Sequence, residues 1–119
     1  MSYDLTNKRV YLSGPMTGII DHNGPAFADA ERRCMDAGAL MVFNPATAWG
    51  HNDRPTSWYM CADLHRLTLS DGERPLFDAV VLLDGWHHSE GATLEYQVAR
   101  ACGIALVNLR EVGRDDASD

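Results

Sequence analysis

Short apolar segments alternate with amphipathic segments along most of this chain. The short segments are rich in apolar and β-branched residues and end at turn-forming residues, as strands do; they cover residues 8–13, 39–43, 77–83 and 104–109. Between them, apolar residues recur at helical spacing in segments 25–37, 56–70 and 89–101. Thr56 or Ser57 is expected to cap the second helix, and Ser89 or Glu90 opens the third. A loop rich in Asn, Asp, Pro and Gly fills residues 45–55.

This order predicts an α/β fold, because parallel strands need crossover connections, and helices usually supply them. We expect a single-domain open parallel sheet with helices on both faces, Rossmann-like or flavodoxin-like, over residues 8–109. Residues 1–7 form an N-terminal extension and residues 110–119 a polar, acidic tail, and both ends are expected to fray. Ligands of such sheets bind beyond the carboxyl ends of the strands.

Each predicted helix has an apolar face. In the first helix this face consists of Phe27, Ala30, Cys34 and Ala37. In the last helix, Leu94, Val98 and Ala101 are expected to face the core. Glu95 would then lie at the edge of the apolar face, beside Ala92 and Ala99.

The composition of the chain argues against several classes of binding partner. Seventeen acidic residues against ten basic ones give a net charge of −7, so we expect no nucleic acid as a partner, since a phosphate backbone would be repelled. The chain has no apolar segment long enough to span a membrane and no export signal, so we expect no membrane partner and a cytoplasmic location. Three cysteines, odd in number and far apart, are expected to be buried thiols of a reduced protein.

Three loops follow predicted strands at one edge of the sheet: residues 13–18, 44–46 and 84–91. In the third loop, Ser89 and Gly91 stand at a helix start, where unpaired N–H groups and the helix dipole favour an anion such as a phosphate. The alternative is that Ser89 is only an N-cap.

Three further residues are candidates for chemistry. Glu95 could be a partly desolvated but ionised carboxylate, suited to nucleophilic attack, or simply a surface residue. Asp63 stands among apolar neighbours within a helix and could contact a substrate or move a proton, or pair with Arg66. Tyr11 precedes the first turn, so its hydroxyl could reach the same edge of the sheet, or be merely half-buried.

We expect neither a metal nor another cofactor. His87 and His88 are adjacent, and neighbouring histidines rarely bind one ion together; no Cys-x-x-Cys or His-x-x-x-His pair is present. The spacing of a dinucleotide-binding loop and that of a serine nucleophile elbow are also missing.

Five segments together resemble the nucleoside 2-deoxyribosyltransferase superfamily, especially its small members of the DUF4406 type. They are VYLSGPMTG (10–18), VFNPA (42–46), WYMCADL (58–64), DAVVLLDGW (78–86) and SEGATLE (89–95). The five segments occur along residues 8–109 in the same order as in that superfamily. Together they are specific for it, although no single segment is.

The resemblance implies cleavage of an N-glycosidic bond through a covalent glycosyl-enzyme. It makes Glu95 the nucleophile, Tyr11 the residue that holds and tunes it, and Asp63 the residue that serves the base. Substrate-binding residues would come from the three loops: Ser13, Gly14, Pro15, Met16, Gly18, Asn44, Ser89 and Gly91. It also implies a homo-oligomer, since family enzymes often complete the pocket with a neighbouring subunit.

Two departures from the family pattern bear on the substrate. Transferases that act on free nucleosides carry an acidic residue where this chain has Ser89, whereas Ser-x-Gly is typical of members that hydrolyse deoxynucleoside 5′-monophosphates. The usual Glu-Leu-Gly is replaced by Glu95-Tyr96-Gln97. We therefore expect an enzyme that cleaves a (deoxy)nucleoside or its 5′-monophosphate and transfers the sugar to another base or to water.

Two other functions stay open. The altered Glu-Tyr-Gln segment would fit a nucleotide-binding or sensing module without catalysis. Residues 91–95 also suggest a phosphoribohydrolase of the lysine-decarboxylase-like type, although the Pro-Gly-Gly expected before that helix is missing.

Overall fold

The computed structural model describes residues 3–16, 19–49 and 54–113. Four parallel strands form one sheet in the order β2-β1-β3-β4. They are β1 (Arg9–Ser13), β2 (Met41–Phe43), β3 (Ala79–Leu82) and β4 (Ala105–Asn108). The chain runs from β1 out to β2 and then crosses to β3 on the other side of β1. The strand order therefore reverses between β1 and β3, and a crevice is expected at their carboxyl ends.

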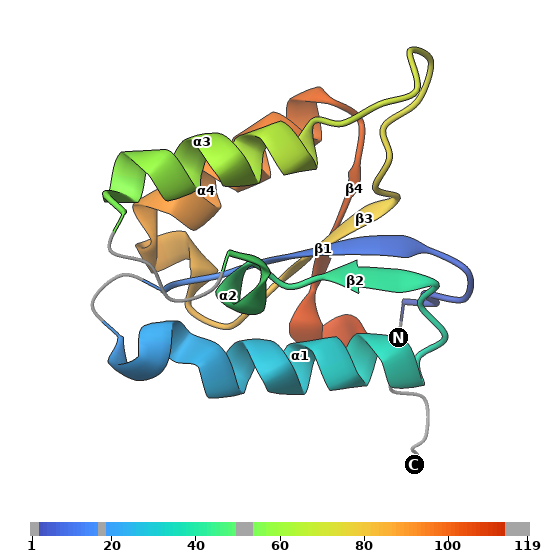
Figure 1. Cartoon of the computed structure of the whole chain (residues 1–119). Coiled ribbons are helices and arrows are strands. Elements are labelled where there is room, and N and C mark those ends of the chain that lie inside the picture. The colour runs from blue at the N-terminus through green and yellow to red at the C-terminus, as the bar shows by residue number, and fades with distance from the viewer. Residues whose placement is uncertain (1–2, 17–18, 50–53, 114–119) are drawn as a thin grey trace.

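Helices cover both faces of the sheet (Figure 1). Helix α1 (Gly24–Asp36) packs on one face, and α3 (Thr56–Leu67) and α4 (Glu90–Ala101) pack on the other. Because successive side chains of a strand point to opposite faces, Val10 and Leu12 join the core beside α1, whereas Tyr11 joins the core beneath α3 and α4. The predicted fold class is confirmed.

Short helices occupy the connections. Helix α2 (Pro45–Ala48) follows β2, and single 3₁₀ turns are formed by η1 (Ile20–Asn23), η2 (Trp86–His88) and η3 (Leu109–Glu111). The expectation of a continuous loop over residues 45–55 is wrong at its start, because the Asn44 side chain accepts a hydrogen bond from the Ala46 N–H and caps α2. The predicted cap of α3 is also wrong: Pro55 precedes the helix, and neither Thr56 nor Ser57 caps it.

The first and last described segments of the chain pack against each other. Tyr3 pairs with Val112, and both Leu5 and Val112 are buried in the core beside α1. Fraying of the ends is therefore a wrong expectation for residues 3–7 and 110–113, because apolar burial holds them. Residues 1–2 and 114–119 lie outside the described part of the chain.

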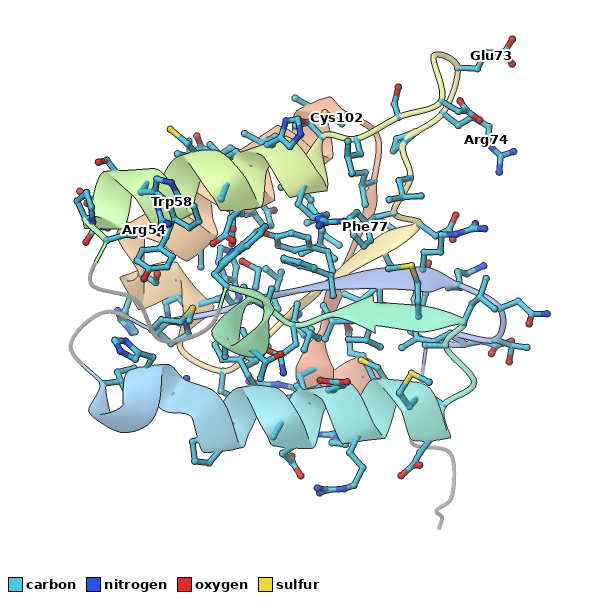
Figure 2. All side chains as sticks on the ribbon, viewed as in Figure 1. Arg54, Trp58, Glu73, Arg74, Phe77 and Cys102 are labelled. Atoms are coloured by element: carbon cyan, nitrogen blue, oxygen red, sulfur yellow. The ribbon has the colours of Figure 1, made fainter. Side chains whose placement is uncertain are left out.

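The cysteines differ from one another. Cys34 is buried on α1, as expected, and burial raises the pKa of its thiol to about 12. Cys61 and Cys102 are exposed, which corrects the expectation that all three are buried. Figure 2 shows Cys102 at the end of α4. No helix in the described segments is both long and apolar enough to cross a membrane.

Candidate active site

A cavity of about 1080 Å³ opens beyond the carboxyl ends of β1, β2 and β3. Its walls come from the loop after β1, the start of α2, one side of α3 and the first turns of α4. Described residues in these walls include Gly14, Pro15, Met16, His22, Ala46, Trp49, Met60, Asp63, His88, Ser89, Gly91, Leu94 and Glu95. The cavity thus lies where the strand order reverses, the usual place for a ligand in such a sheet.

Glu95 lies on the buried face of α4. The residues buried along this helix are Ala92, Glu95 and Ala99. The predicted core stripe is wrong for Ala101, which is exposed, and for Leu94, which is 40% exposed on the cavity wall; Val98 is partly buried against the core. The small side chains of Ala92 and Ala99 let α4 approach the sheet closely, so Glu95, only 6% exposed, points toward β1. The surface alternative for Glu95 is therefore excluded.

Two hydroxyl groups from β1 hold the Glu95 carboxylate. The Tyr11 hydroxyl donates to Oε2 at 2.6 Å, and the Ser13 hydroxyl donates to Oε1 at 2.6 Å. Tyr11 and Ser13 are two positions apart on one strand, so their side chains point to the same face. Ser13 was predicted to bind the substrate. In the structure its hydroxyl donates to the Glu95 carboxylate instead.

Burial sets the ionisation of this group. Desolvation raises the pKa of Glu95 to about 7, against the opposing effect of the two hydrogen bonds, and the negative charge of Asp63 adds to the increase. Burial and the charge of Glu95 also raise the pKa of Tyr11 above its usual value. Tyr11 therefore stays protonated and donates its hydrogen bond, while Glu95 exchanges its proton near neutral pH.

Asp63 reaches the cavity from α3. Its Oδ1 accepts a hydrogen bond from the indole N–H of Trp49 at 2.7 Å. The pairing with Arg66 considered from the sequence is not formed, since the Arg66 guanidinium lies over the Phe43 ring at 5.3 Å. Burial raises the pKa of Asp63 to about 6, and the bond from Trp49 opposes this. The Tyr11 hydroxyl oxygen lies 3.4 Å from the Asp63 carbonyl oxygen, so the two acidic residues flank one phenol.

An aromatic cluster supports both acidic residues. Tyr11 stacks on Phe43 with ring centroids 5.1 Å apart, and Phe43 packs edge-on against Trp49 at 5.9 Å. Phe77 contacts Tyr11 edge-on at 5.5 Å, and Figure 2 shows it between α3 and the sheet. These contacts fix the ring of Tyr11 behind Glu95 and the indole of Trp49 beside Asp63.

The loops around the cavity combine structural and site roles. Ser89 caps α4 by accepting a hydrogen bond from the Ala92 N–H at 3.1 Å, and it also lines the cavity. Gly14 is required for close packing, because an added Cβ would lie 2.7 Å from Cβ of Leu83. At Gly91 an added Cβ would lie 2.9 Å from Cε of Met60, the end of a flexible side chain that can move aside.

The other predicted substrate-binding residues differ in whether they line the cavity. Pro15 and Met16 line the cavity as expected. Asn44 is not among the residues found in its walls, since its side chain caps α2 and donates to Glu31 at 3.0 Å. Gly18 lies outside the described residues. Trp49 was missed, because its contact with Asp63 depends on the fold and its segment was interpreted as a loop.

The charge of the walls is negative. The described lining residues include three acidic side chains, Asp63, Glu90 and Glu95, and two histidines, His22 and His88. No Lys or Arg is among them. An anionic group of a ligand would therefore rely on backbone N–H groups and hydroxyls. Among the described residues, no three His, Cys, Asp or Glu side chains are grouped as a metal ion requires.

Comparison with known proteins shows the family to which this chain belongs. No curated protein and no solved structure matches the chain. The sequence model of one family, described as a domain of unknown function (DUF4406), matches residues 8–108, which span the sheet, its helices and every described wall of the cavity. The chain therefore belongs to the DUF4406 family.

Proposed function

We propose that this protein cleaves the N-glycosidic bond of a (deoxy)nucleoside or its 5′-monophosphate through a covalent glycosyl-Glu95 intermediate. One observation carries the proposal. A buried carboxylate in a cavity wall is held by two hydroxyl donors, with a second acidic group facing the same cavity. Any buried glutamate needs hydrogen-bond donors, but a position in a cavity wall beside a second acidic group is what a nucleophile requires, since it must be fixed in place and kept near its ionisation point.

The first chemical step follows from these groups. A carboxylate oxygen of Glu95 bonds to the anomeric carbon, the C–N bond breaks, and its electron pair passes to the base nitrogen. Asp63 supplies the proton that makes the base a better leaving group. The positive charge that develops on the sugar is stabilised by Glu95 mainly in the transition state, so the interaction accelerates the step.

The second step restores the enzyme. Water or a nitrogen of another base bonds to the anomeric carbon, the bond to Glu95 breaks, and the attacking group loses a proton, with Asp63 placed to accept it. Hydrolysis and transfer share the first step and differ only in the acceptor. Tyr11 and Ser13 hold the carboxylate through both steps.

The sugar's 5′ end would face the start of α4. There Ser89 and Gly91 line the cavity opposite the loop that follows β1. In the absence of Lys or Arg among the described lining residues, the N–H groups of the first turn of α4 and the Ser89 hydroxyl would hold a 5′-phosphate. The Ser-x-Gly pattern favours the monophosphate as substrate.

The resemblance to nucleoside 2-deoxyribosyltransferases supports the proposal, because two of the residues it implicates, Glu95 and Asp63, line one cavity, and the third, Tyr11, donates a hydrogen bond to Glu95 from behind it. The departure after Glu95 leaves this geometry intact. Tyr96 is partly buried against the same core as Tyr11 and stacks on Trp86 with ring centroids 4.8 Å apart, whereas Gln97 lines the cavity.

Release of free base tests the proposal. The protein is incubated with deoxyribo- and ribonucleosides and their 5′-monophosphates, with and without a second base, and the products are separated by chromatography. We expect base release by the wild type and its loss in Glu95→Gln. Glu73→Gln is the matched control, since Glu73 lies in an exposed loop far from the cavity (Figure 2). Thermal stabilisation by nucleotides without any base release would instead support a binding module.

A further inference from the structure

The hydrogen bond from Trp49 distinguishes the two oxygens of Asp63. The indole N–H donates to Oδ1 at 2.7 Å. Oδ2 receives no hydrogen bond from any described residue. Every buried side-chain oxygen of the described residues has a hydrogen-bond partner, so Oδ2 is not buried. Since Asp63 is a wall residue of the cavity, Oδ2 is the oxygen that remains accessible from it.

This asymmetry fixes where a proton on Asp63 must sit. An indole can donate a hydrogen bond but cannot accept one. A proton on Oδ1 would lie close to the indole hydrogen and weaken the hydrogen bond from Trp49. A proton on Oδ2 leaves that hydrogen bond intact. We propose that Trp49 is a positioning residue that keeps the Asp63 proton on Oδ2, aimed at the leaving base. The inference rests on the proposed function.

The indole itself is firmly held. Its ring packs against Phe43 at 5.9 Å and against Trp58 at 5.8 Å, and the Arg66 guanidinium lies 6.0 Å from its centroid. Because Phe43 also stacks on Tyr11, one aromatic cluster fixes the holders of both acidic groups. The geometry between nucleophile and proton donor is thereby set before a ligand binds.

Other charged groups share this environment. The titratable and charged groups near Asp63 or in the same cavity are Tyr11 on β1, Tyr59 and Arg66 on α3, Glu90 and Glu95 on α4, His22 in η1 and His88 in η2. The negative charge of Asp63 raises the pKa of Glu95 across the cavity. The bond from Trp49 lowers the pKa of Asp63, so removing it raises that pKa.

The inference specifies the class of leaving group. A proton on Oδ2 helps only a base that presents a ring nitrogen or carbonyl oxygen to receive it, as natural nucleobases do. A glycoside with an activated leaving group, such as 4-nitrophenolate, departs without protonation. Substrates of the first kind should therefore depend on Trp49, and those of the second should not.

Trp49→Phe tests this, because phenylalanine keeps an aromatic ring but removes the N–H. We expect base release at pH 5 to fall about tenfold, part of the ~10²–10⁴-fold that a positioned proton donor contributes. The ratio of variant to wild-type rate should rise with pH, since Asp63 holds its proton longer. Hydrolysis of the activated glycoside should change less than twofold. Trp58→Phe is the matched control from the same cluster, and its ratio should stay flat with pH.

A second readout needs no turnover. The protein has three tryptophans, and the indole N–H signal of Trp49 in an ¹H–¹⁵N spectrum should shift as Asp63 titrates near pH 6, but not in Asp63→Asn. If the wild type releases no base, the proposed function fails. If it does, but Trp49→Phe matches Trp58→Phe at every pH and no indole signal follows Asp63, the inference about Trp49 alone is overturned.

Discussion

The hydroxyl of Tyr11 lies 2.6 Å from Oε2 of Glu95, although 84 positions separate the two residues in the chain. They meet because β1 pairs with β3 in the middle of the sheet and α4 follows β3 after the short turn η2. Since Tyr11 keeps its proton, its hydroxyl supports the ionised form of Glu95 in a site that otherwise disfavours the charge.

Tyr11→Phe should slow base release by about tenfold or more, because a hydrogen bond to a charged group contributes about 1.5–3 kcal/mol. Without it, the pKa of Glu95 rises further. Because the pKa of Glu95 lies above that of Asp63, the alkaline limb of the pH–rate profile follows Glu95, and this limb should move to higher pH. Rates measured from pH 5 to 9 check this, with Tyr96→Phe as the matched control. An unshifted limb would show that the phenol does not tune Glu95.

The pH dependence of base release should be bell-shaped with its maximum between about pH 6 and 7. Glu95, whose pKa is raised to about 7, must lose its proton to attack, and Asp63, whose pKa is raised to about 6, must keep its proton to donate it. The two groups interact, so the profile reports the pair rather than either residue alone. A rate that increased steadily up to pH 9 would contradict Asp63 as proton donor.

Glu95→Gln should stabilise the folded protein in alkaline solution. The pKa of Glu95 rises from 4.5 to about 7 on folding, so the folded state binds this proton more tightly than the unfolded state. Its contribution is complete below about pH 4.5 and is lost as the pH rises through 7, at a cost of about 3 kcal/mol.

Thermal unfolding of wild type and Glu95→Gln at pH 8 and pH 4 measures this difference. The variant should melt several degrees higher at pH 8, with little difference at pH 4. Equal melting temperatures at both pH values would mean that the carboxylate is not desolvated as the structure indicates.

Ser89 separates a nucleotide substrate from a nucleoside. Ser89→Asp keeps an N-cap for α4 but places a negative charge where the 5′-phosphate would bind. We expect kcat/KM for the monophosphate to fall at least tenfold relative to that for the nucleoside. Ser89→Ala should instead cost about 1 kcal/mol of stability through loss of the cap. An equal effect of Ser89→Asp on both substrates would place the phosphate elsewhere.

The fold could be predicted because its pattern is local. Apolar strand segments and amphipathic helices alternate, and the crossover rule for parallel strands then leaves few architectures. The short helix α2 escaped prediction because its sequence has the Asn and Pro residues of a loop, which here cap and start a helix.

The site could be predicted only in part, because its contacts are tertiary. Leu94 and Val98 looked like the core face of α4 since they are larger and more apolar than Ala92 and Ala99. In the structure the smaller residues, Ala92 and Ala99, face the sheet. Their size lets α4 approach β1 closely, so Tyr11 and Ser13 reach Glu95. The partner of Asp63, Trp49, stands 14 positions away and carried no local signal.

The mass of the peptide that contains Glu95 tests the central claim most directly. The wild type is mixed with a 2′-fluorinated nucleoside or nucleotide, whose fluorine slows both glycosyl transfers, and is then quenched in acid and digested. The account predicts one glycosyl group on that peptide at Glu95, released base in equal amount, and neither product in Glu95→Gln. Base release without any glycosylated peptide, together with undiminished turnover by Glu95→Gln, would contradict it.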